Sequence, residues 1–266
     1  MIQFVFCAGL YGAEPGLSVE EIVQRSVKAN DADWKAAPNY AFIETDTIHK
    51  DSETTRKQYQ VLIIDGSSYN KLLAVNGEPL PAAKAREEER KLQKEIVRRR
   101  NESSEARGKR VAKYAQERRQ DHELMGEMVK AFQYKLVGKE SIYGHRCYVI
   151  EATPRPGYVP PNRDTKVLTG MRGKLWIDAD AFQWVKVHAE VVRPVAFGLF
   201  IAQVRPGTEF TLEEAPVKPG IWLPTHFSTQ VKATILGFWS RNSSDDEIYT
   251  NYRPMSDIQL GGHAAR

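Results

Sequence analysis

The feature that most constrains this fold is a two-residue alternation of apolar and polar side chains, which is clearest in residues 183–193. Polar side chains at even positions separate an apolar set that consists of Val185, Val187, Ala189 and Val191. Successive side chains of a β-strand point to opposite faces, so this pattern predicts a strand with one buried face and one wet face. Strands of this kind are typical of antiparallel sheets.

About ten segments alternate in this way or are short apolar runs rich in β-branched residues. They are residues 42–49, 57–65, 69–75, 133–141, 146–153, 174–178, 183–193, 209–214, 221–236 and 247–253. Asp65-Gly66, Asn76-Gly77 and Tyr143-Gly144 separate neighbouring segments and predict tight hairpin turns. An open antiparallel sheet of this size must curl. We therefore expect a mainly β (α+β) protein with a curved sheet, whose concave face is covered by a helix and a loop.

Two regions read as helical. Ser18 and Glu21 have the spacing of a capping box, which predicts a helix over about 18–30. Residues 81–130 are rich in Ala, Glu, Lys and Arg and are interrupted at 101–104, which predicts a helical hairpin inserted between strands and largely solvated.

The inserted hairpin carries most of the basic character of the chain. Residues 84–120 contain 14 Lys and Arg against 7 Asp and Glu, a local net charge of +7. The segment could be a simple spacer, or a basic arm that faces anionic lipid head groups or an envelope protein. Nucleic acid is not an expected partner, because the arm lacks interleaved aromatic side chains.

The segment Val195–Ala202 does not alternate, because it is apolar throughout and lies between Pro194 and Pro206. It could be a strand buried on both faces, or a short helix or irregular lid over the concave side. We favour the helix or lid, because a proline suits the first position of a helix.

Residues 1–13 read like the end of a secretory signal peptide, with a small-residue cleavage site near Ala13. A buried N-terminal strand is the alternative interpretation. A signal peptide predicts export to the periplasm, and its removal takes away Cys7 and leaves Cys147 as the only cysteine. No later segment reaches the ~18 consecutive apolar residues of a transmembrane helix.

Motifs that carry chemistry are missing from the sequence. It has no Gly-x-Ser-x-Gly, no phosphate loop, no dinucleotide fingerprint and no His-Glu-x-x-His, and its six histidines lie far apart. Asp178 and Asp180 belong to a turn, His188 lies on a wet strand face and Cys147 is a small core residue. We therefore expect no catalytic residue, no metal and no cofactor, and we do not expect an enzyme.

Several strand–turn–strand motifs point to a known family. The run Leu136-Val-Gly-Lys-Glu-Ser-Ile-Tyr-Gly-His-Arg-Cys-Tyr-Val-Ile-Glu-Ala-Thr-Pro154 is followed by Gly173-Lys-Leu-Trp-Ile-Asp178, Gln183-Trp-Val-Lys-Val187, Ile221-Trp-Leu-Pro224 and Tyr249-Thr-Asn-Tyr-Arg253. These motifs resemble LolA-like outer-membrane lipoprotein-sorting proteins over roughly 18–76 and 132–253. The motifs are structural, so they identify a fold better than a function.

The resemblance implies a half-open β-barrel with a helical lid, which holds acyl chains against its concave face. It implies a single β domain formed by 14–80 and 131–258, with 81–130 as an insertion foreign to the standard carrier. In that carrier an arginine near the second strand latches the lid, and Arg56 lies in a comparable region.

We therefore predict a periplasmic carrier whose apolar cavity binds lipid or the acyl chains of lipoproteins. The alternative is an envelope sensor or interaction module on the same fold, without transfer activity. The predicted cavity residues are Val187, Val191, Phe197, Phe200, Phe210, Leu223, Phe227 and Val231.

Overall fold

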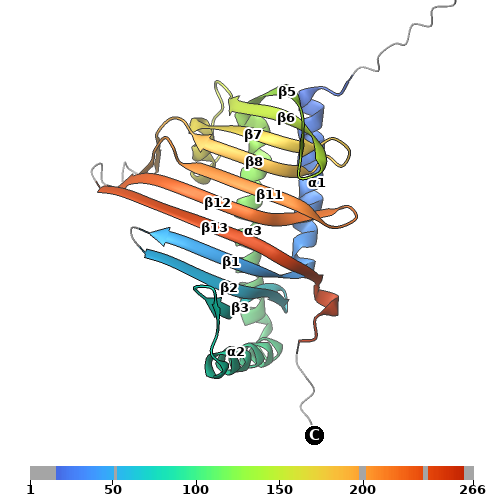
Figure 1. Ribbon diagram of the computed structural model, residues 1–266, viewed down its shortest axis with the longest axis vertical. Helices are drawn as coiled ribbons and strands as arrows, with labels where there is room; N and C mark the ends of the chain where they lie inside the picture. Colours follow the sequence, from blue (N-terminus) through green and yellow to red (C-terminus); the bar gives the residue numbers. More distant parts are fainter. Residues whose placement is uncertain (1–15, 51–52, 198–201, 236–238, 261–266) are drawn as a thin grey trace, which may run out of the picture.

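The computed structural model describes residues 16–50, 53–197, 202–235 and 239–260, and these form one antiparallel sheet with helices packed on it (Figure 1). The strands are β1 (Tyr40–Lys50), β2 (Glu53–Ile64), β3 (Ser67–Val75), β4 (Glu78–Pro79), β5 (Phe132–Ile142), β6 (His145–Pro154), β7 (Met171–Asp178), β8 (Trp184–Val191), β9 (Val195–Phe197), β10 (Ala202–Val204), β11 (Glu209–Lys218), β12 (Ile221–Ile235) and β13 (Trp239–Pro254). The helices are α1 (Val19–Ala36), α2 (Ala82–Arg100) and α3 (Ser104–Ala131), with short 3₁₀ turns η1 (Ala37–Asn39), η2 (Asp164–Gly170) and η3 (Met255–Asp257).

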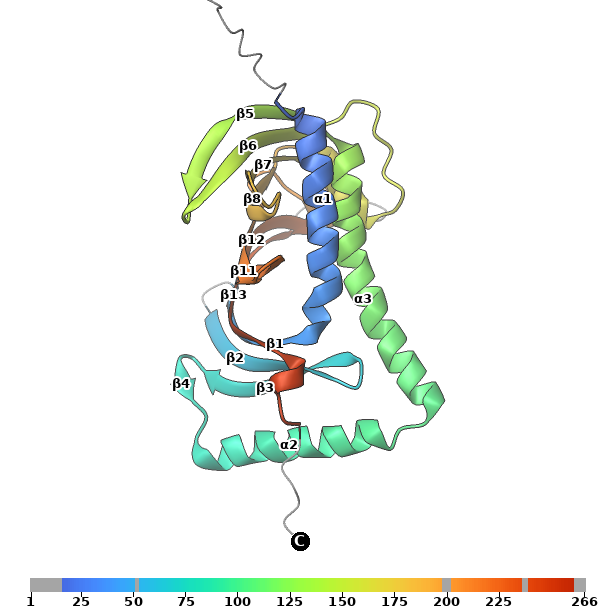
Figure 2. The same ribbon diagram turned by 90° about the vertical axis from the view of Figure 1, so that its right-hand side faces the viewer.

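The sheet has 13 strands, and its main path runs β4-β3-β2-β1-β13-β12-β11-β8-β7-β6-β5, while β10 pairs with β12 and β9. Among the described residues β4 and β5 do not pair with each other, so the sheet stays open. Figure 2 shows that it curves around α1 and α3. The prediction of a curved, half-open antiparallel sheet with helices is confirmed, whereas the division into domains stays a prediction.

The predicted turns reverse the chain where expected. Asp65 and Gly66 have φ values of 47° and 89°, and both residues of Asn76-Gly77 and of Tyr143-Gly144 also have positive φ values. This left-handed conformation is required in two-residue hairpins, because it matches the twist of the flanking strands. The turns therefore set the register of β2–β3, β3–β4 and β5–β6.

Helix α1 begins at the predicted capping box, in which Ser18 and Glu21 bond to each other's backbone amides. It is longer than predicted and ends at Ala36. The buried positions of its second half are Asn30 and Asp33, which are polar. The apolar pattern in the sequence therefore ends before the helix does, and the predicted helix was too short.

The main core lies between the concave face of the sheet and the two helices α1 and α3 (Figure 2). Ile22 and Val23 of α1 pack there against inward-facing residues of β6, β7 and β8, including Ile150, Leu175 and Trp184. The last two turns of α3 close this core with Leu124, Met125, Met128 and Val129.

Helix α2 packs on the opposite, convex face of the sheet, at the β2–β3 end. Leu92 and Ile96 are buried against Leu62 and Ile64 of β2. Arg99 is only 6% exposed and donates hydrogen bonds to the carbonyls of Ile64, Ser67 and Ser68.

Two helices therefore lie where the hairpin was predicted, and most residues of α2 are exposed, so the hairpin is largely solvated as expected. The buried contacts of Arg99 with β2 and β3 were not expected. Arg99 lies in a run of charged residues, and charge alone does not show which side chain of such a run is buried against the sheet and bonded to three carbonyls. Whether the β domain folds without residues 85–119 stays a prediction.

The structure also corrects the prediction for the apolar segment after Pro194. Val195–Phe197 and Ala202–Val204 are two short antiparallel strands, β9 and β10, so the favoured short helix is wrong where the chain is described. Val195 is buried and β10 extends the pairing of β12, which explains the apolar, non-alternating composition. Leu199, Phe200 and Ile201, which we expected to form the lid, lie outside the described residues.

Candidate functional site

An apolar cavity of about 300 Å³ lies between α3 and the concave face of the sheet. Its lining comes from α3, η2 and strands β5, β6, β7, β8, β11 and β12. The lining residues are Leu124, Met125, Met128, Phe132, Ala152, Val167, Leu168, Met171, Gly173, Leu175, Trp184, Val187, Ala189, Phe210, Thr211, Leu212 and Phe227.

The strand register explains why these side chains meet. Residues directly opposite each other in an antiparallel pair share one face. Leu212 of β11 lies opposite both Val187 of β8 and Phe227 of β12, while Phe210 lies opposite Ala189. Three neighbouring strands therefore present a continuous apolar floor. Methionines 125 and 128 form part of the roof, and methionine adapts readily to ligands of different shape.

The cavity offers no reactive polar group. The indole nitrogen of Trp184 donates to Ser26 of α1 at 3.1 Å, so it is already satisfied. The hydroxyl of Thr211 lies 3.2 Å from a ring nitrogen of His188. A site of this composition suits burial of a hydrocarbon rather than bond-making chemistry.

The predicted cavity residues fall into three groups. Val187, Phe210 and Phe227 line the cavity. Val191 is buried in the same core, whereas Leu223 and Val231 are not among the residues that line the cavity. A bulge at Thr225 lies between Leu223 and Phe227 and breaks the alternation on which the prediction relied.

The two remaining predicted residues, Phe197 and Phe200, cannot be placed at the site. The backbone of Phe197 ends β9, but its side chain is outside the described part, and Phe200 lies wholly outside it. Arg56, compared above with a latch, is exposed and lies opposite Thr47 in the β1–β2 pair.

Sequence reasoning missed a group of four carboxylates on the same concave face, which we call the acidic wall: Glu44 and Asp46 of β1 with Asp245 and Glu247 of β13. Glu247 lies directly opposite Phe227, so the acidic wall continues the apolar floor. Glu247 also lies opposite Asp46, and Glu44 lies opposite Tyr249.

Burial and the neighbouring carboxylates raise the proton affinity of Glu44 and Asp46. Burial, followed by the charges of Glu247, Asp46 and Asp245, raises the pKa of Glu44 to about 7. Burial and the neighbouring carboxylate of Asp245 raise the pKa of Asp46 to about 6. Only weak compensation comes from Lys57, which lies opposite Asp46 and is exposed.

A second pair of carboxylates lies beneath the end of α1. Asp33 is 4% exposed and accepts a 3.0 Å hydrogen bond from the backbone amide of Trp222. Burial raises its pKa to about 6. Burial and the charge of Asp33 raise the pKa of Glu214 well above its ordinary value.

The other sequence candidates have structural roles. Asp178 accepts hydrogen bonds from the backbone amides of Asp180 and Ala181, as in an Asx turn. Cys147 is fully buried, and burial raises the pKa of its thiol to about 11, which disfavours the reactive thiolate. Among the described residues, His, Cys, Asp and Glu side chains form no group of three that could hold a metal ion.

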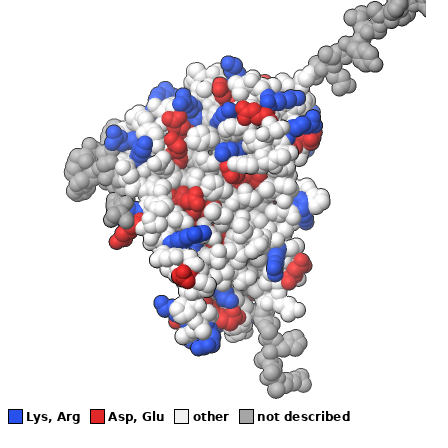
Figure 3. All heavy atoms as spheres, in the orientation of Figure 1, with Lys and Arg blue, Asp and Glu red and all other residues white. Residues whose placement is uncertain are grey.

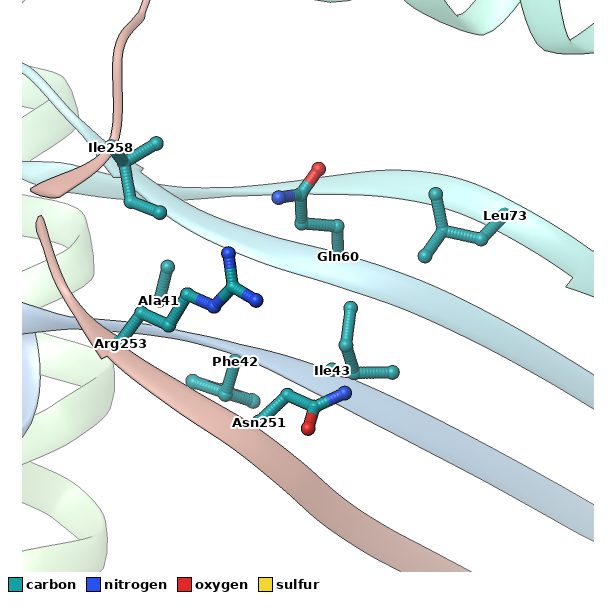
Figure 4. Close-up of a pocket in the computed structure, with 8 residues that line it drawn as sticks. All are labelled: Ala41, Phe42, Ile43, Gln60, Leu73, Asn251, Arg253 and Ile258. Atoms are coloured by element: carbon teal, nitrogen blue, oxygen red, sulfur yellow. The ribbon is translucent and has the colours of Figure 1, made fainter. Parts of the chain in front are cut away.

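The outer face of the sheet differs from the concave face. Basic and acidic side chains are intermingled there (Figure 3), in pairs such as Arg172 with Glu190 and Lys186 with Glu213. A hollow of about 260 Å³ lies between β13, β1, β2 and the C-terminal segment. In Figure 4 the Arg253 side chain reaches over Ala41 toward Gln60, with Ile258 at one end. This hollow is smaller than the apolar cavity, and its lining is more polar.

No described helix combines the length and the apolar character needed to cross a membrane. No protein-family model and no curated protein sequence matches the chain.

Three solved structures show what the chain is similar to. A LolA superfamily protein from Nitrosomonas europaea has 14% identity and a TM-score of 0.32, over 90% of this chain and 94% of that one. A DUF1329 family protein from Desulfovibrio piger has 13% identity and a TM-score of 0.34, over 91% and 95%. The MucA/MucB complex of Pseudomonas aeruginosa has 10% identity and a TM-score of 0.24, over 86% and 98%.

Proposed function

We propose that this protein is an exported carrier that binds an acyl chain, from a lipid or a lipidated protein, in the cavity under α3. The observation that carries the proposal is the cavity itself, which lies between a helix and a sheet and has an apolar lining. Its periplasmic location, inferred from residues 1–13, is part of the proposal.

The energetics support a chain of moderate length. Each buried methylene contributes about 0.8 kcal/mol, so about ten methylenes contribute about 8 kcal/mol. Association costs at least about 4 kcal/mol in lost freedom of motion. The remainder corresponds to useful but reversible binding, which suits a carrier that must release its ligand.

The proposal is tested by filling the cavity. Ala189→Leu places three extra carbons on the floor opposite Phe210, and we expect affinity for a dodecanoyl ligand to fall by about tenfold or more. Binding is measured by titration calorimetry, and lipid extracted from the purified protein is identified by mass spectrometry. The matched control is Ala112→Leu on the exposed side of α3, which should bind normally.

Equal binding by both variants would place the ligand elsewhere. Failure of the unaltered protein to bind any acyl ligand would favour the alternative, a sensor or interaction module. For such a module, α2 and the rest of the basic arm 84–120 would be the surface that contacts an envelope protein or a membrane.

A further inference from the structure

The hollow of about 260 Å³ on the outer side of the sheet combines an apolar wall with polar side chains that donate hydrogen bonds (Figure 4). Its polar side chains are those of Gln60, Asn251 and Arg253, so the lining carries one positive charge and includes no acid. The apolar wall comes from β1, β3 and the C-terminal segment, through Ile43, Leu73 and Ile258. Donors and a cation beside an apolar surface suit a ligand with an anionic end and an apolar body.

A bulge in β13 aims Arg253 into this hollow. Two residues of β13 lie opposite Phe42 alone, and one of them, Asn251, has a left-handed φ of 55°. Tyr249 faces the concave side, so an unbroken alternation would put Arg253 on that side too. Because of the bulge, Arg253 instead lies opposite Ala41, on the outer side. Bulges are common next to functional sites, where they change the direction of a side chain.

The three polar side chains are not engaged within the described part of the protein. There, neither the guanidinium of Arg253 nor the side-chain amides of Asn251 and Gln60 form a hydrogen bond, and Arg253 forms no salt bridge. By contrast, Lys71, which lies opposite Gln60, is paired with Glu89 of α2. Arg253 is exposed, so a ligand reaches its guanidinium without a rearrangement of the fold.

The donor set favours a carboxylate. A guanidinium presents two parallel N–H groups that match the two oxygens of a carboxylate, and charge-assisted hydrogen bonds of this kind are stronger than neutral ones. The primary amides of Asn251 and Gln60 supply further N–H donors at the same hollow. The single charge of Arg253 balances a carboxylate, whereas it neutralises only part of the charge of a phosphate, which is about −2.

The volume limits the rest of the ligand. A hollow of about 260 Å³ is smaller than the ~300–1,000 Å³ of sites that bind drug-sized molecules, so the ligand is small. In Figure 4 Ile258 lies at one end and Leu73 at the other, with Ile43 between them. A short apolar body therefore finds contacts along the length of the hollow.

We propose that this hollow binds a small organic carboxylate, with the carboxylate on Arg253 and a short apolar body against Ile43, Leu73 and Ile258. Asn251 and Gln60 orient the carboxylate by donating hydrogen bonds to its oxygens. The site is separate from the apolar cavity under α3, so the inference does not depend on the carrier function.

The test is a titration with three probes that share one shape: isocaproate, isocaproamide and isohexylamine. Binding is followed by NMR through the side-chain NH₂ signals of Asn251 and Gln60, at about pH 7, where the carboxylate is ionised. We expect isocaproate to bind with a dissociation constant on the order of 1 mM. The amide and the amine should bind at least about tenfold more weakly, because neither forms a charge-assisted pair with Arg253. Inorganic phosphate should also bind at least about tenfold more weakly.

Variants locate the binding. Arg253→Gln should weaken binding of isocaproate at least about tenfold, since it removes both the charge and the paired donors. The matched control is Arg56→Gln, which removes the same charge from an exposed arginine of β2 outside this hollow and should keep the affinity. Asn251→Gly preserves the left-handed backbone and should cost about threefold. Backbone amide spectra of each variant show that it is folded.

The outcomes separate this inference from the carrier function. Loss of affinity in Arg253→Gln but not in Arg56→Gln, with a preference for the carboxylate, supports the inference. Equal binding of isocaproate and isocaproamide, equal or tighter binding of phosphate, or an equal loss in both arginine variants would overturn it. Ala189→Leu, which fills the apolar cavity, should bind isocaproate normally. If only Ala189→Leu lost binding, the probe would occupy the apolar cavity, which would overturn this inference and support the carrier function.

Discussion

The two halves of the concave face are built by the same sheet but have opposite chemistry. Between β6 and β12 most inward side chains are apolar, are covered by α1 and α3, and include fully buried residues such as Ile150 and Ile177. Between β13 and β1 they include four half-buried, crowded carboxylates beside aromatic side chains such as Phe42 and Tyr249. The first half stabilises the fold through burial, whereas the second half opposes folding through desolvation and repulsion. A surface that costs stability is a candidate for a binding role.

The largest expected effect comes from breaking the apolar half. Leu175 is 2% exposed, lines the cavity and packs in the main core. Leu175→Ala should lower the free energy of unfolding by about 2–5 kcal/mol, since it removes buried methyl groups and enlarges the cavity. Urea unfolding followed by circular dichroism measures the change.

The matched control for Leu175 is Leu136→Ala on the edge strand β5, where the leucine is 40% exposed. We expect this change to cost less than about 1 kcal/mol. If the two substitutions were equally costly, the apolar half would not be the main source of stability.

The second expected effect is a dependence of stability on pH that comes from the acidic half. The pKa of Glu44 is raised from 4.5 to about 7 in the folded state, so the folded protein binds a proton more tightly than the unfolded chain does. Protonation therefore stabilises the fold, and this stability is lost as the pH rises through the folded pKa. The titratable groups near Glu44 are Asp46, Asp245, Glu247, Tyr249 and Tyr252.

We expect the melting temperature to fall by a few degrees between about pH 5 and about pH 8. Glu44→Gln should raise the melting temperature at the upper end of this range and flatten the profile. Glu190→Gln on the outer face serves as the control and should leave the profile unchanged. A melting temperature that rises with pH would contradict the assignment of unpaired carboxylates to this half.

The smallest expected effect concerns two members of the wall. The carboxylate of Asp245 contributes to the raised pKa of Asp46, which is about 6. Asp245→Asn should therefore let the pKa of Asp46 fall back toward the ordinary value of an aspartate. Carboxyl carbon chemical shifts in an NMR titration report this change.

Asp246→Asn provides the control for that titration. Asp246 is the next residue along β13 but faces the outer side, where it contacts His226 at 2.7 Å. Asp246→Asn should therefore leave the titration of Asp46 unaltered. If both substitutions lowered the pKa of Asp46 equally, the loss of any charge from β13, and not only of a charge on the concave face, would be sufficient.

Local sequence patterns were sufficient for much of the fold. The capping box at Ser18, the turn at Asp65-Gly66 and the alternation of Val187, Ala189 and Val191 in β8 each depend on residues within a few positions of one another. A bulge at Val185 places that residue in a different cluster, with Cys147 and Trp222. Part of the cavity could be predicted in the same way, since Val187, Phe210 and Phe227 each lie on an alternating strand. The bulge at Thr225 has no comparable signature, and it breaks the alternation on which the placement of Leu223 relied.

The sequence by itself determined where the strands lie, where they turn and which residues of one strand share a face. Only the tertiary structure decided which face is concave and which strands are neighbours. Glu44 and Asp46 share a face with Phe42, which was visible in the sequence, but Asp245 and Glu247 join them only because β1 pairs with β13. The physical reason is that an alternation with a period of two is symmetric between the two faces, whereas strand pairing depends on the closure of long loops that no local pattern specifies.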